Sequence, residues 1–316
     1  MGPRQDVRAH NHRFACRLAR RISLRIGQII ESVVGTDAAI LTAMPAEPPV
    51  RTKIIAVVVA TIAALFCRAW LELELLADGY HKYFAADLSY LVVPPILLIL
   101  LFPIWRLDGA LISSLYRRRG LSLTIVLNAI AIGFLLRTAA WCELVAGVSL
   151  GWYSNPKATT IGGPTFTFGC PEPDVLLLGV AVMVVLVPIV EETTNRGLIQ
   201  SWLSERGPNI AICSQALLFM LAHRPSSWGF AFVAGVVLGI QCWRTKSLWA
   251  SLITHATING LIQLDWRCTR GNWNPPPSEV PIWSSGIISI LALILALLSI
   301  AILLREKTGV HDAPRK

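Results

Sequence analysis

The chain has 316 residues, of which 54% are hydrophobic and 15% charged, and its formal net charge at pH 7 is +9. Its mean hydropathy is +0.59. This composition excludes an ordinary soluble enzyme and is typical of an integral membrane protein.

Residues 1–52 are predicted to form a basic amphipathic segment that ends in a linker. Its first half contains seven arginines and a single acidic residue, Asp6, and apolar residues recur there at spacings of three and four. Such a helix would lie on an anionic membrane surface. A cleaved transit peptide, which is also rich in arginine and poor in acids, is the alternative. Residues 36–52 contain three prolines and are interpreted as the linker.

Apolar segments that could cross a bilayer follow, since a span needs about 20 mostly apolar residues. We place eight of them, at 53–70, 89–105, 121–150, 175–203, 208–223, 228–243, 247–264 and 282–304. The segment 121–150 carries Arg137 and Glu143, and is either one long tilted helix or a span followed by an interfacial helix. The sequence therefore predicts an all-α polytopic membrane protein with about eight transmembrane helices and one membrane domain at 53–304.

The basic residues are distributed unevenly between the loops. With the N-terminus inside, 20 Lys and Arg lie in the predicted inner segments, at 1–53, 106–120, 204–207, 244–246 and 305–316. Only 5 lie in the predicted outer loops, at 71–88, 151–174, 224–227 and 265–281. The positive-inside rule then predicts that both termini, including a tail at 305–316, are cytoplasmic, and we expect a bacterial inner membrane. No basic groove interleaved with aromatic residues is visible, so a nucleic-acid partner is not expected.

The seven cysteines are scattered and form no Cys-x-x-Cys pair, which argues against a structural zinc site. Cys170 and Cys268 fall in predicted outer loops. Sequence alone does not fix the distance between them, so a disulfide and two unpaired thiols both stay open.

Three short motifs place charged and polar residues on successive apolar segments. They are Glu191-Glu192-Thr193-Thr194-Asn195-Arg196-Gly197, Phe219-Met220-Leu221-Ala222-His223 and His255-Ala256-Thr257-Ile258-Asn259. Polar groups are costly in hydrocarbon, so they are usually retained there for a reason. Carboxylates and imidazoles together can activate water, which makes these residues the candidate site.

Helix geometry separates the two carboxylates. Glu192 and Arg196 are four residues apart and share a face, whereas Glu191 points about 100° away. We expect Glu192 to neutralise Arg196 and to leave Glu191 free to act. His255 and Asn259 have the same spacing and should project together. The alternatives are a structural ion network for the charged residues and ordinary core packing for a lone histidine such as His223.

Four glycines in this region, Gly197, Gly235, Gly239 and Gly260, are expected to permit close helix approach in the membrane. This is a packing role, and we assign no chemistry to them.

The three motifs in sequence resemble the signature of the CPBP intramembrane proteases, also called the Abi family. This family includes the CAAX prenyl endopeptidases and bacterial bacteriocin-processing and self-immunity proteins. The resemblance covers a motif core at about 175–264 in order and spacing. The chain departs from it at Thr193 and Asn195, where many members have Leu and an aromatic residue, so its first motif helix is more polar than usual.

The resemblance implies a glutamic endopeptidase that works inside the membrane. By this analogy Glu191, assisted by His223, activates a water, and His255 and Asn259 bind the oxyanion. Glu192 and Arg196 would support them. The cluster would lie near the middle of the membrane in a buried polar cavity that admits water.

The resemblance also implies metal-free chemistry and no cofactor. Zinc is the disfavoured alternative, because Glu and His are zinc ligands but the His-Glu-x-x-His helix is absent. The partners would be the lipid bilayer and a membrane-anchored protein or peptide substrate.

Two other classes of function compete with a protease. One is a non-catalytic bacteriocin self-immunity or binding protein on the same scaffold, which intact motifs do not exclude. The other is a proton-coupled transporter in which Glu191 and the histidines relay protons. No inverted repeat is visible in the sequence, which argues against the transporter.

Overall fold

The computed structural model describes residues 48–117, 121–149, 165–168, 173–223, 225–272, 287–288 and 290–299. Most of the predicted N-terminal segment, the predicted tail 305–316 and Cys170 lie outside these residues. The predictions of an amphipathic helix and of a disulfide therefore stay predictions.

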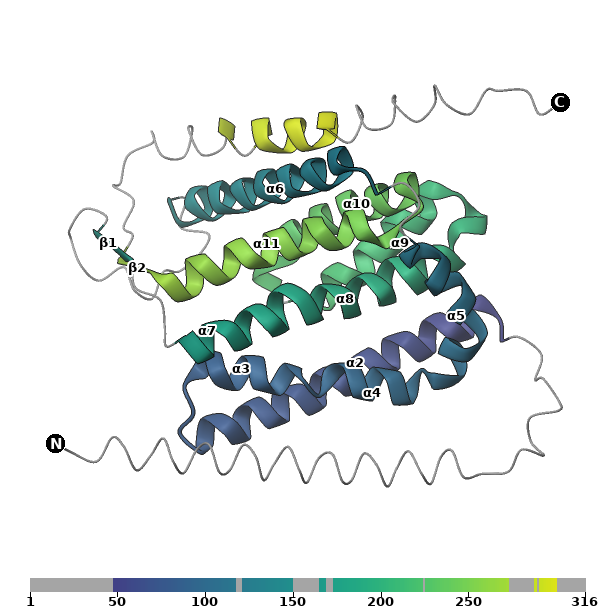
Figure 1. Ribbon diagram of the computed structural model, residues 1–316, viewed down its shortest axis with the longest axis horizontal. Helices are drawn as coiled ribbons and strands as arrows, with labels where there is room; N and C mark the ends of the chain where they lie inside the picture. The colour runs from purple at the N-terminus through teal and green to yellow at the C-terminus, as the bar shows by residue number, and fades with distance from the viewer. Residues whose placement is uncertain are drawn as a thin grey trace. The chain divides into compact units, whose positions relative to one another are not determined.

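Helices make up nearly all of the described chain (Figure 1). They are α2 (Val50–Ala77), α3 (Lys82–Tyr90), α4 (Val93–Leu100), α5 (Phe102–Tyr116), α6 (Leu123–Ser149), α7 (Pro173–Gly179), the π-helix η2 (Val180–Leu186), α8 (Val187–Glu192), the π-helix η3 (Thr193–Gln200), the 3₁₀ turns η4 (Ser204–Arg206) and η5 (Pro225–Ser227), α9 (Pro208–Leu221), α10 (Trp228–Thr245), α11 (Leu248–Cys268) and a last helix at Ile290–Ser299.

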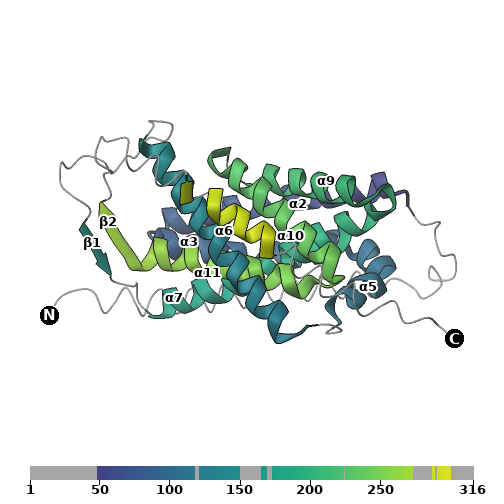
Figure 2. The same cartoon turned by 90° about the horizontal axis from the view of Figure 1, so that it is seen from above.

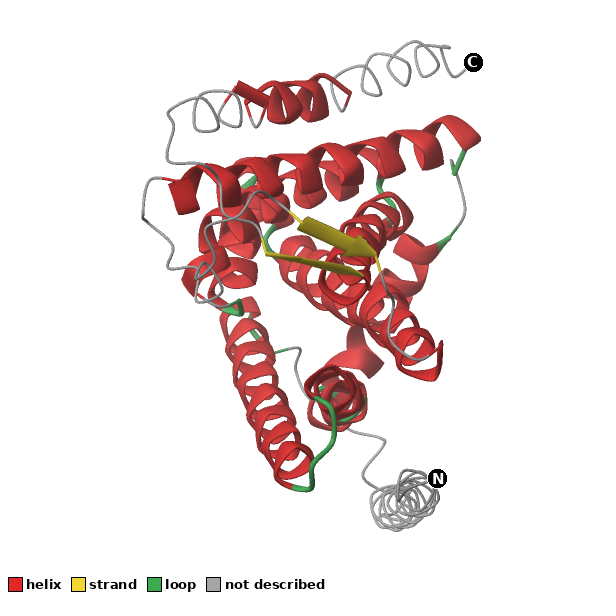
Figure 3. Ribbon diagram, turned by 90° about the vertical axis from the view of Figure 1, so that its left-hand side faces the viewer, coloured by secondary structure: helices red, strands yellow, loops and turns green. Residues whose placement is uncertain are grey.

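The exception is a short antiparallel ladder between β1 (Thr165–Phe168) and β2 (Thr269–Asn272). Figure 3 shows the two strands in yellow. Thr165 lies opposite Asn272, and Phe168 lies opposite Thr269. Both strands fall in segments predicted as outer loops. The predicted all-α class is confirmed, with this small ladder as an addition.

Three helices of the described chain are long and apolar enough to cross a membrane: Val50–Ala77, Leu123–Ala140 and Val175–Gln200. A fourth span would be formed by Phe84–Leu100 and Phe102–Tyr116 together, which are bent by 93° at their junction. These helices confirm a membrane protein. The remaining predicted spans do not combine this length and hydropathy in the described residues, so the number eight stays a prediction.

The bend corrects one part of the sequence interpretation. Residues 89–105 were expected to form one span and 106–120 an inner loop, but the helix breaks at Leu101 and continues as α5 to Tyr116. Pro103 follows the break and has no N–H to continue the α4 hydrogen bonds. Buried Asp108 explains why α5 packs inward, because its Oδ2 lies 3.1 Å from the Nζ of buried Lys53 at the start of α2.

Residues 173–200, which we call the motif helix, alternate between α and π geometry, with a π-helix on each side of α8. A π-helix pairs each N–H with the carbonyl five residues earlier. The side chains of Thr193, Thr194 and Asn195 each donate a hydrogen bond to the carbonyl four residues earlier, at 2.5, 2.8 and 2.8 Å. The unusual polarity of this helix is therefore satisfied within the helix itself.

The motif helix lies between two groups of helices (Figure 1). On one side it contacts α3 and α5, and an apolar cluster joins it to α2 and α4 through Val57, Leu97 and Val182. On the other side it contacts α9, α10 and α11. Seen from above, α6 runs obliquely across α11, and a second apolar cluster joins these helices to the last one (Figure 2).

Glycines set the closest helix contacts. As predicted, Gly235 and Gly239 of α10 permit close helix approach, because an added Cβ atom would lie 3.0 Å (Gly235) or 2.6 Å (Gly239) from atoms of α9. Gly197 and Gly260 are not needed for close approach, since an added Cβ atom would lie 3.6 and 3.9 Å from its nearest neighbours, which is ordinary van der Waals contact. The sequence analysis missed Gly133 of α6, where a Cβ would lie 2.7 Å from the Cβ of Thr257 on α11.

We predict that Gly133→Ala destabilises the protein by about 1–3 kcal/mol, because the added methyl must displace α6 from α11. Thermal unfolding in detergent measures the effect. The matched control is Gly109→Ala in α5, where nothing lies within 4 Å of the new methyl. Gly109→Ala should be neutral or stabilising by about 0.5–1 kcal/mol. Equal unfolding temperatures for the two variants would contradict the close α6–α11 contact.

Candidate active site

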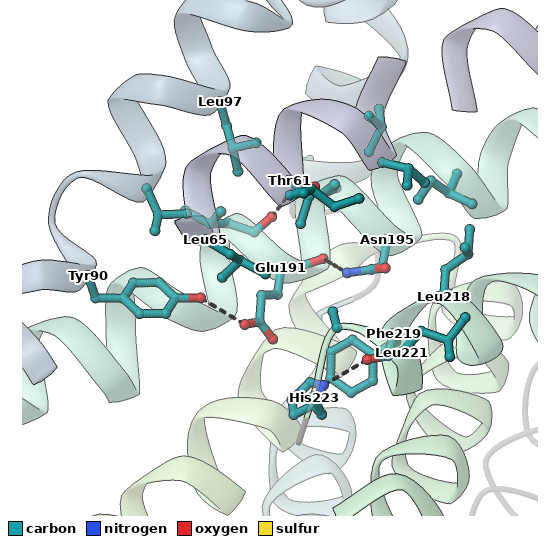
Figure 4. A pocket seen from close by; sticks show the side chains of 18 residues that line it. Thr61, Leu65, Tyr90, Leu97, Glu191, Asn195, Leu218, Phe219, Leu221 and His223 are labelled. Carbon is teal, nitrogen blue, oxygen red and sulfur yellow. Dashed lines mark hydrogen bonds between the residues drawn. The ribbon is translucent and has the colours of Figure 1, made fainter. Parts of the chain in front are cut away.

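A cavity of about 360 Å³ lies between α2, the α3–α4 segment, the motif helix and the end of α9 (Figure 4). Most of its wall is apolar, contributed by side chains such as Val57, Leu97 and Leu218. Its polar side chains come mainly from the motif helix and from residues that face it: Tyr90, Glu191, Thr194, Asn195 and His223, with Thr61 from α2. The cavity therefore has one polar wall, and the first two motifs lie on it.

Glu191 is the carboxylate that lines the cavity, and 22% of its side chain is exposed. Its Oε1 accepts a hydrogen bond from the Tyr90 hydroxyl at 2.9 Å. Its Oε2 lies 3.7 Å from Nε2 of His255. Figure 4 shows the carboxylate between the Tyr90 hydroxyl and the His223 ring. The prediction that Glu191 points away from the Glu192 ion pair is confirmed.

Glu192 is fully buried, and so is its partner Arg196. Oε1 of Glu192 accepts hydrogen bonds from Arg196 Nη1 at 2.9 Å and from His255 Nδ1 at 2.8 Å. Arg196 also donates to the Gly235 carbonyl at 3.2 Å, and its guanidinium lies 4.6 Å from the Phe219 ring centre. The predicted Glu192–Arg196 pair is present, and a buried charge needs such a partner. Oε2 of Glu192 and Nε of Arg196 have no hydrogen-bond partner among the described residues.

His255 bridges the two carboxylates, an arrangement that the sequence did not predict. The ring is 5% exposed on α11. Because its Nδ1 faces a carboxylate oxygen, Nδ1 carries a proton, and Nε2 is directed at Glu191. Sequence spacing had grouped His255 with Asn259. Asn259 instead donates to the Met183 carbonyl of η2 at 2.8 Å, and it does not line the cavity.

His223 follows the last turn of α9 and lines the cavity. Its Nδ1 lies 2.7 Å from the Phe219 carbonyl, which can only accept, so Nδ1 donates and a neutral ring keeps Nε2 as an acceptor. Its own carbonyl accepts a hydrogen bond from Trp228 Nε1 at 3.0 Å. The structure thus brings His223 to the same cavity as Glu191 and fixes its tautomer.

Tyr90 is the site residue that the sequence analysis missed. It lies 101 positions before Glu191 and belongs to no motif. The one available signal was a tyrosine in an otherwise apolar segment, because a buried phenol hydroxyl usually has a hydrogen-bond partner. Sequence does not name that partner.

The described residues contain no group of three or more His, Cys, Asp or Glu side chains that could hold a metal ion. The carboxylates and imidazoles of the site contact one another, the Tyr90 hydroxyl, the Arg196 guanidinium and the Phe219 carbonyl.

We predict that Glu192→Gln destabilises the protein by about 3–5 kcal/mol, because it leaves Arg196 charged and buried without a counterion. Thermal unfolding measures this loss. Glu72→Gln is the matched control, since Glu72 pairs with Arg68 at the same i, i+4 spacing but both side chains are about a quarter exposed, at 26% and 27%. Exposed pairs contribute about 1 kcal/mol or less. Similar unfolding temperatures for the two variants would show that the buried pair is dispensable.

We also predict that water reaches the cavity. Cysteines introduced at Thr194 or Ala222, both of which line it, should react with small water-soluble thiol reagents. The background should keep buried Cys242 as an internal control that stays unlabelled until the protein unfolds. Protection of both new cysteines in folded protein would mean that the polar wall is sealed from water.

Comparison with known families gives one match. Residues 173–261 match the family model described as type II CAAX prenyl endopeptidase Rce1-like. The matched range contains Glu191, Glu192, Arg196, His223, His255 and Asn259. Comparisons with curated proteins and with solved structures find no match. At residues 173–261 this membrane protein therefore carries a type II CAAX prenyl endopeptidase Rce1-like domain, which indicates a peptidase that acts on peptide bonds.

Proposed function

We propose that the protein is an intramembrane glutamic endopeptidase that hydrolyses a peptide bond of a membrane-anchored protein or peptide. The observation that carries this proposal is the division between the two adjacent glutamates. Glu192 is buried and neutralised by Arg196, whereas Glu191 lines a cavity and keeps a carboxylate oxygen directed towards an imidazole. A carboxylate that is held in place but not neutralised can act as a general base.

In this mechanism Glu191 removes a proton from a water molecule in the cavity as the water attacks the scissile carbonyl carbon. His223 accepts a hydrogen bond from the same water through Nε2 and orients it. The attack gives a tetrahedral intermediate with a negative oxygen. When the C–N bond breaks, the proton held by Glu191 passes to the leaving nitrogen, so that an amine and a carboxylic acid are formed and the base is restored.

The negative oxygen of the intermediate needs donors that are already in place. We assign this role to His255 and Asn259. With Nδ1 donating to Glu192, a doubly protonated His255 ring would donate to the oxyanion through Nε2. Asn259 uses one N–H on the Met183 carbonyl, and its amide nitrogen carries two. The second N–H would serve the oxyanion if substrate binding extends the cavity towards α11, because neither Asn259 nor His255 is among the residues that line it.

The apolar walls of the cavity favour a substrate that enters from the membrane. Side chains of α2 and α4 form those walls and would contact apolar parts of a membrane-anchored chain, while the peptide bond meets the polar wall. We propose a multi-pass protein of a bacterial inner membrane with both termini in the cytoplasm, and catalysis without a metal ion.

We predict that Glu191→Gln abolishes cleavage of a membrane-anchored reporter peptide and leaves the unfolding temperature near that of the wild type, because it removes the base and keeps the shape. Glu205→Gln, at an exposed acid of η4, is the control and should cleave normally. Wild-type cleavage should also survive extensive chelation.

Other outcomes would point to the competing functions. Full activity of Glu191→Gln would refute the assignment of this site. Activity lost on chelation and restored by zinc would make the histidines metal ligands. An inactive wild-type protein that still binds a membrane peptide would favour the immunity or binding protein. Proton flux in proteoliposomes that depends on Glu191 would favour the transporter.

A further inference from the structure

The hydroxyl of Tyr90 is the one side-chain hydrogen-bond donor found on the Glu191 carboxylate among the described residues. This contact joins α3 to the motif helix across 101 positions of sequence, with an O–O distance of 2.9 Å. Tyr90 is 6% exposed and also lines the cavity. We infer that Tyr90 is a positioning residue that orients the Glu191 carboxylate for the reaction. The inference rests on the proposed function.

The ring of Tyr90 is held where its hydroxyl can reach Glu191. Tyr90 is the last residue of α3, just before the turn at Leu91 and Val92 that leads into α4. The guanidinium of Arg68, on α2, lies 4.9 Å from the centre of its ring, and Arg68 is in turn paired with Glu72 at 3.4 Å. Tyr90 is therefore fixed by its own helix and by α2.

The hydrogen bond gives the two carboxylate oxygens different surroundings. Oε1 is occupied by the Tyr90 hydroxyl, and Oε2 lies 3.7 Å from His255 Nε2, beyond hydrogen-bond distance. Without the hydroxyl, the carboxylate is free to rotate and to close that gap. A direct Glu191–His255 contact would occupy both the base and the proposed oxyanion donor. Tyr90 thus keeps the base apart from the imidazole.

The neutrality of the phenol matters for this role. Glu192 is held by Arg196, whose charge neutralises it and removes it from chemistry. Tyr90 holds Glu191 through a neutral donor, which fixes the orientation of the carboxylate and leaves its negative charge available to take a proton. The two adjacent glutamates are therefore held by different kinds of partner, in keeping with their different roles.

Tyr90→Phe tests the inference because it removes one oxygen atom and keeps the ring, the cavity wall and the contact with Arg68. We expect kcat for the reporter peptide to fall by about ten- to a hundredfold, the effect of losing a hydrogen bond to a charged group. KM should stay within about twofold, since the apolar surface that meets the substrate is unchanged. A purely structural role would not produce this separation of kcat from KM.

Tyr116→Phe is the matched control. The Tyr116 hydroxyl bonds Thr193 of the same motif helix at 2.5 Å but does not contact Glu191. This variant measures the cost of losing a phenol hydroxyl on the motif helix, and it should lower the unfolding temperature by a similar amount with little change in kcat. If Tyr90→Phe unfolds far more easily than Tyr116→Phe, or raises KM without lowering kcat, the positioning role is wrong.

Glu191→Gln, assayed alongside, separates this inference from the proposed function. An active wild type, an inactive Glu191→Gln and a fully active Tyr90→Phe would overturn the role of Tyr90 alone. An inactive wild type or an active Glu191→Gln would overturn the proposed function, and the inference with it.

Discussion

The buried ion pair between Glu192 and Arg196 is the interaction on which the rest of the site depends. Neither side chain has any exposed surface, so each charge must find its partners inside the protein. Those partners come from three other helices: His255 of α11, the Gly235 carbonyl of α10 and the Phe219 ring of α9. A single pair four residues apart on one helix thereby fixes how four helices meet, and Gly235 lets α10 come close enough to take part.

The same pair explains why two adjacent glutamates are useful. Successive residues of a helix point about 100° apart, so one side chain can face the protein while the next faces the cavity. Glu192 points into the protein, where its Oε1 accepts hydrogen bonds from Arg196 and His255. Glu191 takes the outward direction and meets no cation at hydrogen-bond distance within the described chain. Because His255 contacts Glu192 through one nitrogen and faces Glu191 with the other, the buried glutamate also sets the ring that faces its neighbour.

Sequence reasoning succeeded where the contact lies within one helix and failed where it joins distant ones. The Glu192–Arg196 pair follows from i, i+4 spacing, and the helical class follows from hydropathy. Periodicity does not indicate which helices are neighbours, so the Tyr90–Glu191 contact and the bond from Asn259 to the Met183 carbonyl were not predicted. The inward turn of α5 was also missed, because Asp108 looked like a loop residue until its partner Lys53 was known.

Three polar residues of the motif helix hydrogen-bond to the backbone of the same helix. The motif helix is unusually polar at Thr193, Thr194 and Asn195. Each of these side chains donates a hydrogen bond to the carbonyl four residues earlier, so burying them in an apolar setting costs little free energy. Glu191 differs, because its Oε2 is buried and has no hydrogen-bond partner among the described residues. An unpaired carboxylate oxygen is expensive to bury, and the rest of the fold must offset that cost. Polarity alone therefore does not identify the reacting group on this helix. Oε2 of Glu192 and Nε of Arg196 also lack hydrogen-bond partners among the described residues, but they belong to a fully buried ion pair. Glu191 is distinguished because its unpartnered oxygen belongs to a carboxylate that lines the cavity.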